Sequence, residues 1–106
     1  MRILRYTKDN GTIPFNDWFS GMRDKVAEAS IRLRLRQLEN GNFGDAKPVG
    51  HGVLELRVHV GAGYRVYCAR RNGDVVILLC GGGKQTQMSD IKIAQSYWAD
   101  WKRRQK

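Results

Sequence analysis

Three strand-like runs separated by short glycine-containing breaks constrain the fold of this 106-residue chain more than any other feature. The runs are Val53–Val60, Tyr64–Arg71 and Val75–Cys80, and the breaks between them are Gly61-Ala62-Gly63 and Asn72-Gly73. An Asn-Gly pair favours a two-residue hairpin turn, because both positions accept positive φ angles. The spacing therefore predicts consecutive antiparallel strands, ended by Gly81-Gly82-Gly83, with a further short strand over Arg2–Thr7.

A first helix is predicted shortly after the Asn10-Gly11 turn. Pro14 suits the first helical position, with Thr12 as a possible cap. Apolar residues then recur at helical spacing, one and two turns apart, and these are Phe15, Trp18, Phe19 and Met22. These aromatic side chains are interpreted as core anchors.

Two further helices complete the pattern. A longer helix is predicted from Asp24 to Asn40, where Gly41 suits the position just beyond a helix end. A last helix is predicted over Ser89–Lys102. The order β-α-α-β-β-β-α predicts one α+β domain over residues 1–106, in which a small antiparallel sheet packs against two N-terminal helices with a C-terminal helix. The helices are expected on one face of that sheet.

The charge balance is the first indication of function. The chain has 19 Lys and Arg against 10 Asp and Glu, for a net charge of +9, while 42% of its residues are hydrophobic. That hydrophobic content predicts a folded domain, and the excess of cations favours a polyanion or an acidic protein as partner. No apolar run long enough to span a membrane occurs, and the polar N-terminus argues against a signal peptide.

The two cysteines, Cys68 and Cys80, do not have the spacing of a disulfide scaffold or of a structural zinc site. We therefore expect a reducing, cytoplasmic setting. No motif has metal-ligand spacing, so no metal and no small-molecule cofactor are expected.

Residues alternate between an apolar and a polar face along Val53–Val60. Leu54, Leu56, Val58 and Val60 share one face, and Glu55, Arg57 and His59 share the other. A three-residue loop at Gly61-Ala62-Gly63 would place His59 opposite Arg65 and Arg57 opposite Tyr67, and it keeps polar residues opposite polar residues. These four side chains are thus predicted to lie together on one face that is open to solvent.

Such a cluster of cations suits a phosphate ligand, because guanidinium groups bind phosphate oxygens in a bidentate fork. In RNA cleavage, a base activates the 2′-hydroxyl and an acid protonates the leaving 5′-oxygen. His59 can serve in either role, and Glu55 is a second candidate base. Tyr67 could stack on a base. Lys84 follows the three glycines at the edge of the same face, with Gln85 and Gln87 as neutral hydrogen-bonding groups.

A set of short motifs along the whole chain gives a family resemblance. The motifs are Leu54-Glu55-Leu56-Arg57, Gly63-Tyr64-Arg65-Val66-Tyr67, Ile77-Leu78-Leu79-Cys80-Gly81-Gly82-Gly83-Lys84, and then Gln87 and Asp90-Ile91. Together they resemble the RelE/ParE superfamily of toxins from type II toxin–antitoxin modules, and in particular the HigB-like addiction module killer protein group.

The resemblance implies a microbial RNase-like fold and a small cytoplasmic toxin. RelE-type members cut mRNA in the ribosomal A site without a metal, and a cognate antitoxin, usually a helix-turn-helix protein in this group, neutralises them. Arg65 matches the arginine that these enzymes place at the scissile phosphate. Lys84 matches the basic residue after the last core strand, and Arg57 lies beside the position of a basic strand residue.

The chain departs from the family pattern where acid–base chemistry is concerned. RelE carries lysines where this chain has Val53 and Glu55, and an arginine where Gln85 stands. It also has a catalytic tyrosine near the start of the last helix, where this chain has Ser89, Asp90 and Ile91. The general acid and base are therefore not transferred by the resemblance, and would have to come from Glu55, His59, Tyr67 or Asp90.

These features predict a ribosome-dependent mRNA endoribonuclease whose partners are mRNA, the ribosome and a cognate antitoxin. The alternative is a ParE-like poison that binds DNA gyrase and performs no chemistry of its own. The polar face favours the nuclease, and the departures from the family pattern favour the gyrase poison. A non-catalytic RNA-binding domain is the weakest of the three interpretations, because the chain lacks the pair of exposed aromatic residues that such sheets use.

Overall fold

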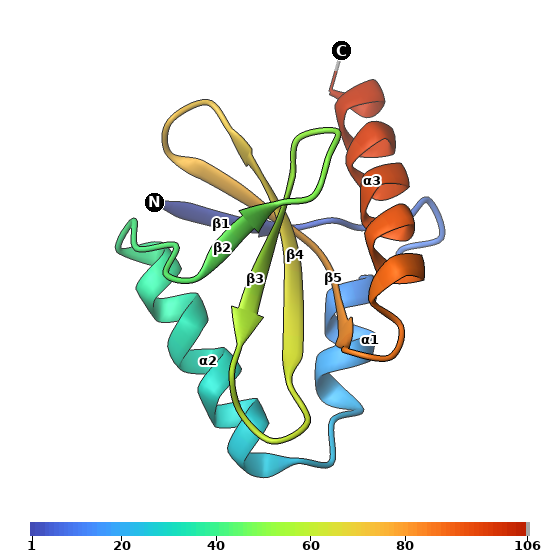
Figure 1. Ribbon diagram of the computed structural model, residues 1–106. Helices are drawn as coiled ribbons and strands as arrows, with labels where there is room; N and C mark the ends of the chain where they lie inside the picture. The colour runs from blue at the N-terminus through green and yellow to red at the C-terminus, as the bar shows by residue number, and fades with distance from the viewer. Residues whose placement is uncertain (106) are drawn as a thin grey trace.

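The computed structural model describes residues 1–105 and shows a small α+β fold with one five-stranded mixed sheet and three helices (Figure 1). In chain order the elements are β1 (Arg2–Arg5), α1 (Pro14–Ser20), α2 (Lys25–Glu39), β2 (Ala46–Pro48), β3 (Val53–Val58), β4 (Tyr64–Arg71), β5 (Val75–Gly83) and α3 (Gln87–Arg104). The predicted helices and the three main predicted strands are all present, with ends that differ by a few residues.

The sheet has the strand order β1-β5-β4-β3-β2. The antiparallel series β3-β4-β5 is the one that the glycine-containing breaks predicted. The expectation of a wholly antiparallel sheet is wrong, because β1 pairs in parallel with β5. Strand β2 was not predicted. It is a three-residue edge strand ending in Pro48, and proline is tolerated in a sheet chiefly at an edge.

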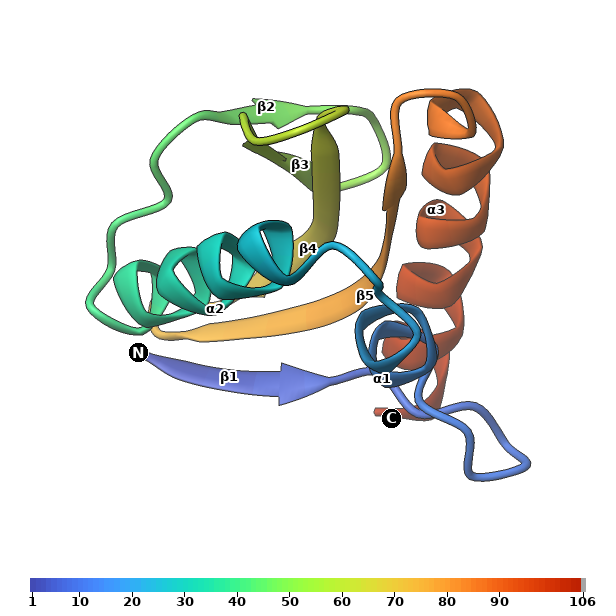
Figure 2. The ribbon, with the colours of Figure 1, turned by 90° about the horizontal axis from the view of Figure 1, so that it is seen from below.

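The helices cover both faces of the sheet, so the expectation that they share one face is wrong. Figure 2 shows the sheet curving around α2, with α3 on the other side of β5. One core lies under α1 and α2 and contains Phe15, Phe19, Ile31, Leu38, Leu56, Val58, Val66, Cys68, Val76 and Leu78. The second lies under α3 and contains Tyr6, Val53, Tyr67, Ala69, Ile77, Leu79, Cys80, Ala94 and Trp98.

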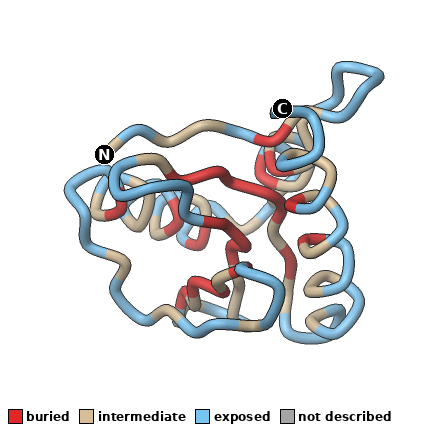
Figure 3. Tube along the Cα trace, turned by 90° about the horizontal axis from the view of Figure 1, so that it is seen from above, coloured by how far each residue is buried: buried red, intermediate tan, exposed pale blue. Residues whose placement is uncertain are grey.

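The central strands explain this two-sided packing. Residues 66–69 of β4 and 76–80 of β5 are buried without interruption, as the red segments in Figure 3 show. A strand that alternates between apolar and polar residues needs cover on one face only, whereas a continuous apolar run needs cover on both. The alternation of apolar and polar residues in β3 therefore did not predict that β4 and β5 are covered on both faces.

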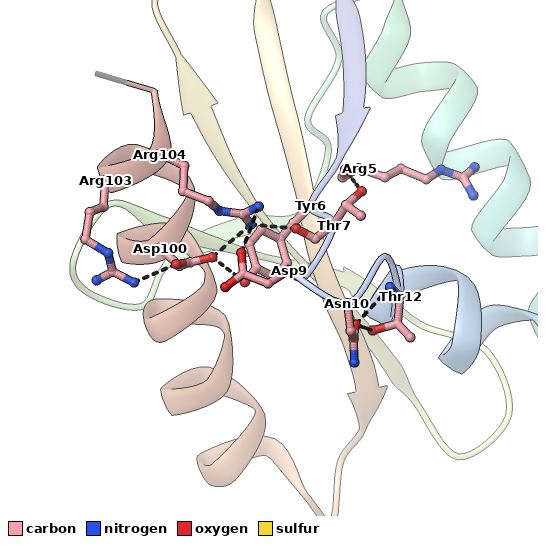
Figure 4. Close-up of polar contacts among 9 residues, drawn as sticks. All are labelled: Arg5, Tyr6, Thr7, Asp9, Asn10, Thr12, Asp100, Arg103 and Arg104. Atoms are coloured by element: carbon pink, nitrogen blue, oxygen red, sulfur yellow. Dashed lines mark hydrogen bonds and ion pairs between the residues drawn. The ribbon is translucent and has the colours of Figure 1, made fainter.

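The helix ends have clear local causes. Asp24 caps α2, since its side chain accepts a hydrogen bond from the backbone N–H of Ala27. Pro14 is the first residue of α1 as predicted, but the residue before the helix is Ile13, which gives no side-chain cap. Thr12, the predicted cap, lies one residue before that position, and its hydroxyl donates to Asn10 (Figure 4).

Helix α3 continues to Arg104, two residues further than predicted, because its last turn is fixed to the N-terminal segment (Figure 4). The Tyr6 hydroxyl donates to Asp100 Oδ2 at 2.7 Å, and Arg104 Nη2 lies 2.8 Å from the same oxygen. Arg104 also donates to the carbonyl of Thr7. Burial and the neighbouring Asp100 raise the pKa of Tyr6 to about 12.

Within residues 1–105, no helix has both the length and the apolar character of a membrane span.

The three glycines were predicted to follow the last strand, which was expected to end at Cys80. They are instead the last three residues of β5. A Cβ atom on Gly81 would overlap the ring of Trp18 in α1, and one on Gly82 would overlap the Asp90 carboxylate in α3. Glycine is therefore needed here so that helices can approach the end of β5 from both faces. Gly83 has open space around its Cα and leads into Lys84.

Candidate functional site

The hairpin between β3 and β4 sets the geometry of the candidate site. Arg57 pairs with Arg65 and Glu55 with Tyr67, so the predicted register is wrong by two residues. The connection spans residues 59–63 instead of 61–63. It closes through the Gly63 N–H, which donates to the Val60 carbonyl at 2.9 Å, and Gly61 and Gly63 both have positive φ.

A shift of two residues preserves the face on which each side chain lies, because side chains alternate with a period of two. Arg57, Arg65 and Tyr67 therefore share one face as predicted, together with Glu55. His59, the fourth residue predicted on this face of the sheet, follows the end of β3 and lies in the connecting loop instead. That face is not open to solvent along its whole length, because α3 covers part of it. Glu55 and Tyr67 are both 0% exposed.

The buried carboxylate of Glu55 organises this face. Its Oε1 accepts from Arg57 Nε at 3.3 Å, and its Oε2 accepts from the Tyr67 hydroxyl at 3.1 Å and from Gln87 Nε2 at 2.9 Å. Arg65 Nε lies 3.5 Å from Oε2. These five residues form the Glu55 cluster, in which Gln87 contributes from the first turn of α3.

The Glu55 cluster leaves an excess of positive charge. One carboxylate faces two guanidinium groups, whose side chains are 34% exposed at Arg57 and 14% exposed at Arg65. Arg65 Nε is buried and has no hydrogen-bond partner among residues 1–105, since Tyr67 and Gln87 already donate to the nearer carboxylate oxygen. The capacity to bind an added anion therefore lies in the exposed parts of the two guanidinium groups, which can donate charge-assisted hydrogen bonds.

Tyr67 cannot stack on a base in this conformation, contrary to the expectation of an open face. Its ring is buried and its hydroxyl donates to Glu55. Burial, and secondarily the Glu55 charge, raise the pKa of Tyr67 far above its ordinary value. Both effects keep the phenol neutral, so Tyr67 acts here as a structural donor.

A hollow of about 470 Å³ lies at the end of the β3–β4 hairpin, lined by residues 57–65 and Lys84. We refer to it as the hairpin hollow. It brings together Arg57, His59 and Arg65 of the β3–β4 hairpin with Lys84, which follows β5. The two guanidinium groups and the Lys84 ammonium group can bind an anion through charge-assisted hydrogen bonds. Gln85 lines a neighbouring hollow, and Gln87 belongs to the Glu55 cluster.

His59 is the most exposed of the candidate acid–base groups. Its Nε2 lies 2.5 Å from Asp45 Oδ2, and the two side chains are 72% and 50% exposed. The hydrogen bond from His59 lowers the pKa of Asp45 below its usual range. Asp45 precedes β2 in a loop that sequence reasoning had not connected to the site. Asp90, another candidate, accepts a hydrogen bond from the Thr86 hydroxyl at 2.6 Å.

Sequence reasoning also missed Tyr64. This residue was placed at the start of a strand and in a family motif but was given no functional role, yet it lines the hairpin hollow. Its hydroxyl donates to Asp24 Oδ2 at 3.3 Å. Burial and the Asp24 charge raise its pKa. The one sequence signal of a role in the site was its position directly after Gly63, where the hairpin loop ends and β4 begins.

Within residues 1–105, no group of three or more His, Cys, Asp or Glu side chains is placed to hold a metal ion. Cys68 and Cys80 are free thiols and are buried in the two cores. Burial raises the pKa of both thiols to about 12, which makes them poor nucleophiles.

Comparison with known proteins gives two matches. Residues 17–99 match the family described as "Phage derived protein Gp49-like (DUF891)". A protein of Haemophilus influenzae (strain ATCC 51907 / DSM 11121 / KW20 / Rd), described as an "Uncharacterized protein", is 50% identical over 84 residues, which is 79% of this chain and 85% of the relative. The family match contains every residue of the hairpin hollow and of the Glu55 cluster.

Proposed function

The chain belongs to the Gp49-like family of phage-derived proteins, and from this we propose that it is the toxin of a type II toxin–antitoxin module. Its proposed activity is ribosome-dependent cleavage of mRNA without a metal, in the cytoplasm. The proposal also rests on the motifs that resemble the RelE/ParE superfamily. The single observation that best supports it is that Arg57, His59, Arg65 and Lys84 all line the hairpin hollow.

A phosphodiester is the ligand that best fits these four side chains. Each guanidinium can form two parallel hydrogen bonds to phosphate oxygens, and the lysine adds a further positive charge. The Glu55 carboxylate lies beneath the arginines and limits their mutual repulsion without neutralising them. The hollow therefore favours a group with more than one anionic oxygen.

The proposed reaction is an internal transesterification of RNA. The 2′-hydroxyl loses its proton and attacks the adjacent phosphorus, while the bond from phosphorus to the 5′-oxygen breaks. The products are a 2′,3′-cyclic phosphate and a 5′-hydroxyl, with the lost proton balanced by the one that the leaving oxygen gains. Negative charge grows on the phosphoryl oxygens during this step, and Arg57 and Arg65 are placed to stabilise it.

His59 is the proposed base in this reaction. It is exposed in the hairpin hollow, and its contact with Asp45 orients the ring through Nε2, which leaves Nδ1 to accept the proton. Glu55 does not fit this role, because its carboxylate is buried and already accepts hydrogen bonds from three residues. Glu55 is instead proposed to position the two arginines.

One observation favours a second candidate function, a ParE-like poison of DNA gyrase. Two of the four candidate acid–base residues, Glu55 and Tyr67, are buried away from any substrate, and a protein that only binds its target needs neither. In that case the hairpin hollow would bind an acidic surface of the target.

The net charge of +9 supports a further part of the proposal, an acidic partner. A cognate antitoxin, of helix-turn-helix type according to the family resemblance, would cover part of this basic surface. Association of that kind weakens as salt concentration rises, because added ions screen the charges.

Brief induction of the wild-type chain in growing bacteria decides between the two functions. We expect growth arrest, new 5′ ends in a reporter mRNA and unchanged plasmid supercoiling. The Arg65→Ala variant should cause neither arrest nor cleavage, whereas Arg70→Ala, at the far end of the same strand, should behave as wild type. Arrest with intact mRNA and altered plasmid supercoiling would reject the nuclease in favour of the gyrase poison.

A further inference from the structure

A second hollow adjoins the hairpin hollow at the ends of β4 and β5. It has a volume of about 410 Å³ and is lined by residues 62–64 and 83–86, so we refer to it as the Tyr64 hollow. The two hollows share residues 62–64 and Lys84 as a common wall. A ligand larger than a phosphate group can therefore occupy both at once.

The two hollows differ in chemistry. The hairpin hollow contains two arginines and a histidine in addition to Lys84, whereas the Tyr64 hollow has Lys84 as its one cation. Neutral polar groups in this hollow include the amide of Gln85, which can donate and accept hydrogen bonds, and the hydroxyl of Thr86, which donates to Asp90 and can still accept one. Gly63 and Gly83 leave its backbone accessible. This combination suits a flat, neutral, hydrogen-bonding group.

Tyr64 supplies a fixed aromatic surface at this wall. Its ring packs in part on the core under α1 and α2 and is partly exposed. Its hydroxyl donates to Asp24, whose other carboxylate oxygen accepts from the Ala27 N–H at the start of α2. The ring is thus held at both ends, and a ring that is already ordered loses little entropy when a ligand stacks on it.

We propose that the Tyr64 hollow is a nucleobase subsite, which binds the base of a nucleotide whose phosphate occupies the hairpin hollow. Tyr64 stacks on the base, and the Gln85 amide donates to and accepts from its hydrogen-bonding edge. Tyr64 takes the stacking role that sequence reasoning gave to Tyr67. This inference rests on the proposed function, because it assumes that the hairpin hollow binds the phosphate of RNA.

The test is an NMR titration of the ¹⁵N-labelled full chain at low salt. The probes are inorganic phosphate, ribose 5-phosphate and the four nucleoside 3′-monophosphates. Stacking of one base on an aromatic side chain should make the best nucleotide about 5- to 100-fold tighter than ribose 5-phosphate. Amide shifts should reach residues 83–86 with nucleotides, but remain within residues 57–65 and Lys84 with inorganic phosphate.

Variants separate stacking from the binding of phosphate. Tyr64→Leu should bind nucleotides no more tightly than ribose 5-phosphate, so the ratio of the two affinities, measured on the same variant, should fall to about 1. Tyr64→Phe keeps the ring and loses only the contact with Asp24, so it should retain most of the nucleotide preference. Gln85→Ala should reduce the differences among the four bases.

Two results would overturn the inference, and they are distinguishable. If phosphate binds the hairpin hollow but nucleotides bind no better than ribose 5-phosphate, the subsite is wrong and the proposed phosphate site remains. If neither phosphate nor any nucleotide shifts residues 57–65, the phosphate site itself is wrong, and the subsite that depends on it is wrong as well.

Discussion

Replacing Glu55 with alanine is expected to be the most destabilising single change in this protein. The substitution leaves the partly buried guanidinium groups of Arg57 and Arg65 without their carboxylate, and it removes the acceptor of Tyr67 and Gln87. Removal of one partner from a buried ion pair costs about 3–5 kcal/mol. For a domain of about this size, that loss corresponds to a fall in Tm of at least about 12 °C.

Thermal unfolding followed by circular dichroism measures this effect. Glu39→Ala is the matched control, because it removes the same charge from an exposed position near the end of α2, and such surface changes stay within about 0.5 kcal/mol. Glu55→Gln should fall between the two, since the amide oxygen still accepts a hydrogen bond but the charge is lost. Equal Tm values for Glu55→Ala and Glu39→Ala would show that the cluster does not stabilise the fold.

Arg65→Ala is expected to have the largest effect on activity. Arg65 lines the hairpin hollow. The substitution removes its ion pair with Glu55 but leaves that carboxylate its contacts with Arg57, Tyr67 and Gln87. Deletion of one donor that stabilises the charge of a transition state lowers the rate by about 10²–10³-fold. The cleavage rate of ribosome-bound mRNA under single-turnover conditions should fall by that factor, with a much smaller change in Tm than for Glu55→Ala.

Two controls define the role of Arg65. Arg65→Lys keeps the charge but loses the planar fork, so its cleavage rate should lie between those of wild type and Arg65→Ala. Arg70→Ala also removes one positive charge from β4, at the end remote from the hairpin hollow, and should cleave at the wild-type rate. A similar loss of rate in Arg65→Ala and Arg70→Ala would mean that overall charge, and not this site, determines activity.

Much of the fold was predictable from local signals. The end of helix α2 was predicted from Gly41, which suits the position beyond a helix, and the strands β3 to β5 follow from the turn residues between them. The parallel pairing of β1 was not predictable, because it joins residues 2–5 to residues 75–78 and no local pattern reports such a distant pairing. To predict that α3 covers the second face of the sheet, one would have had to recognise that the continuous apolar runs of β4 and β5 need cover on both faces.

The sequence predicted which residues of the candidate site share one face of the sheet, but not the register of the strands or which of these side chains are buried. Loops of three and five residues keep the same alternation, so side-chain pattern alone could not decide the register of Arg57 against Arg65. The burial of Glu55 could not be foreseen either, because it depends on Gln87 arriving from α3. Sequence reasoning therefore expected an exposed carboxylate where the structure has a buried one.

The glycines after Cys80 show a similar limit. They were predicted to end the strands, whereas Gly81 and Gly82 lie within β5 and are needed for the close approach of Trp18 and Asp90 of the helices. Lys84, which follows the glycines, lines the hairpin hollow together with Arg57 and Arg65.

The most direct test of the central proposal is a map of mRNA 5′ ends after incubation of the purified chain with a defined mRNA, with and without ribosomes. We predict discrete new 5′ ends with wild-type protein and ribosomes, and none without ribosomes or with Arg65→Ala. Intact mRNA under every condition, or the same cuts with Arg65→Ala as with wild type, would contradict the assignment of the hairpin hollow as the site of RNA cleavage.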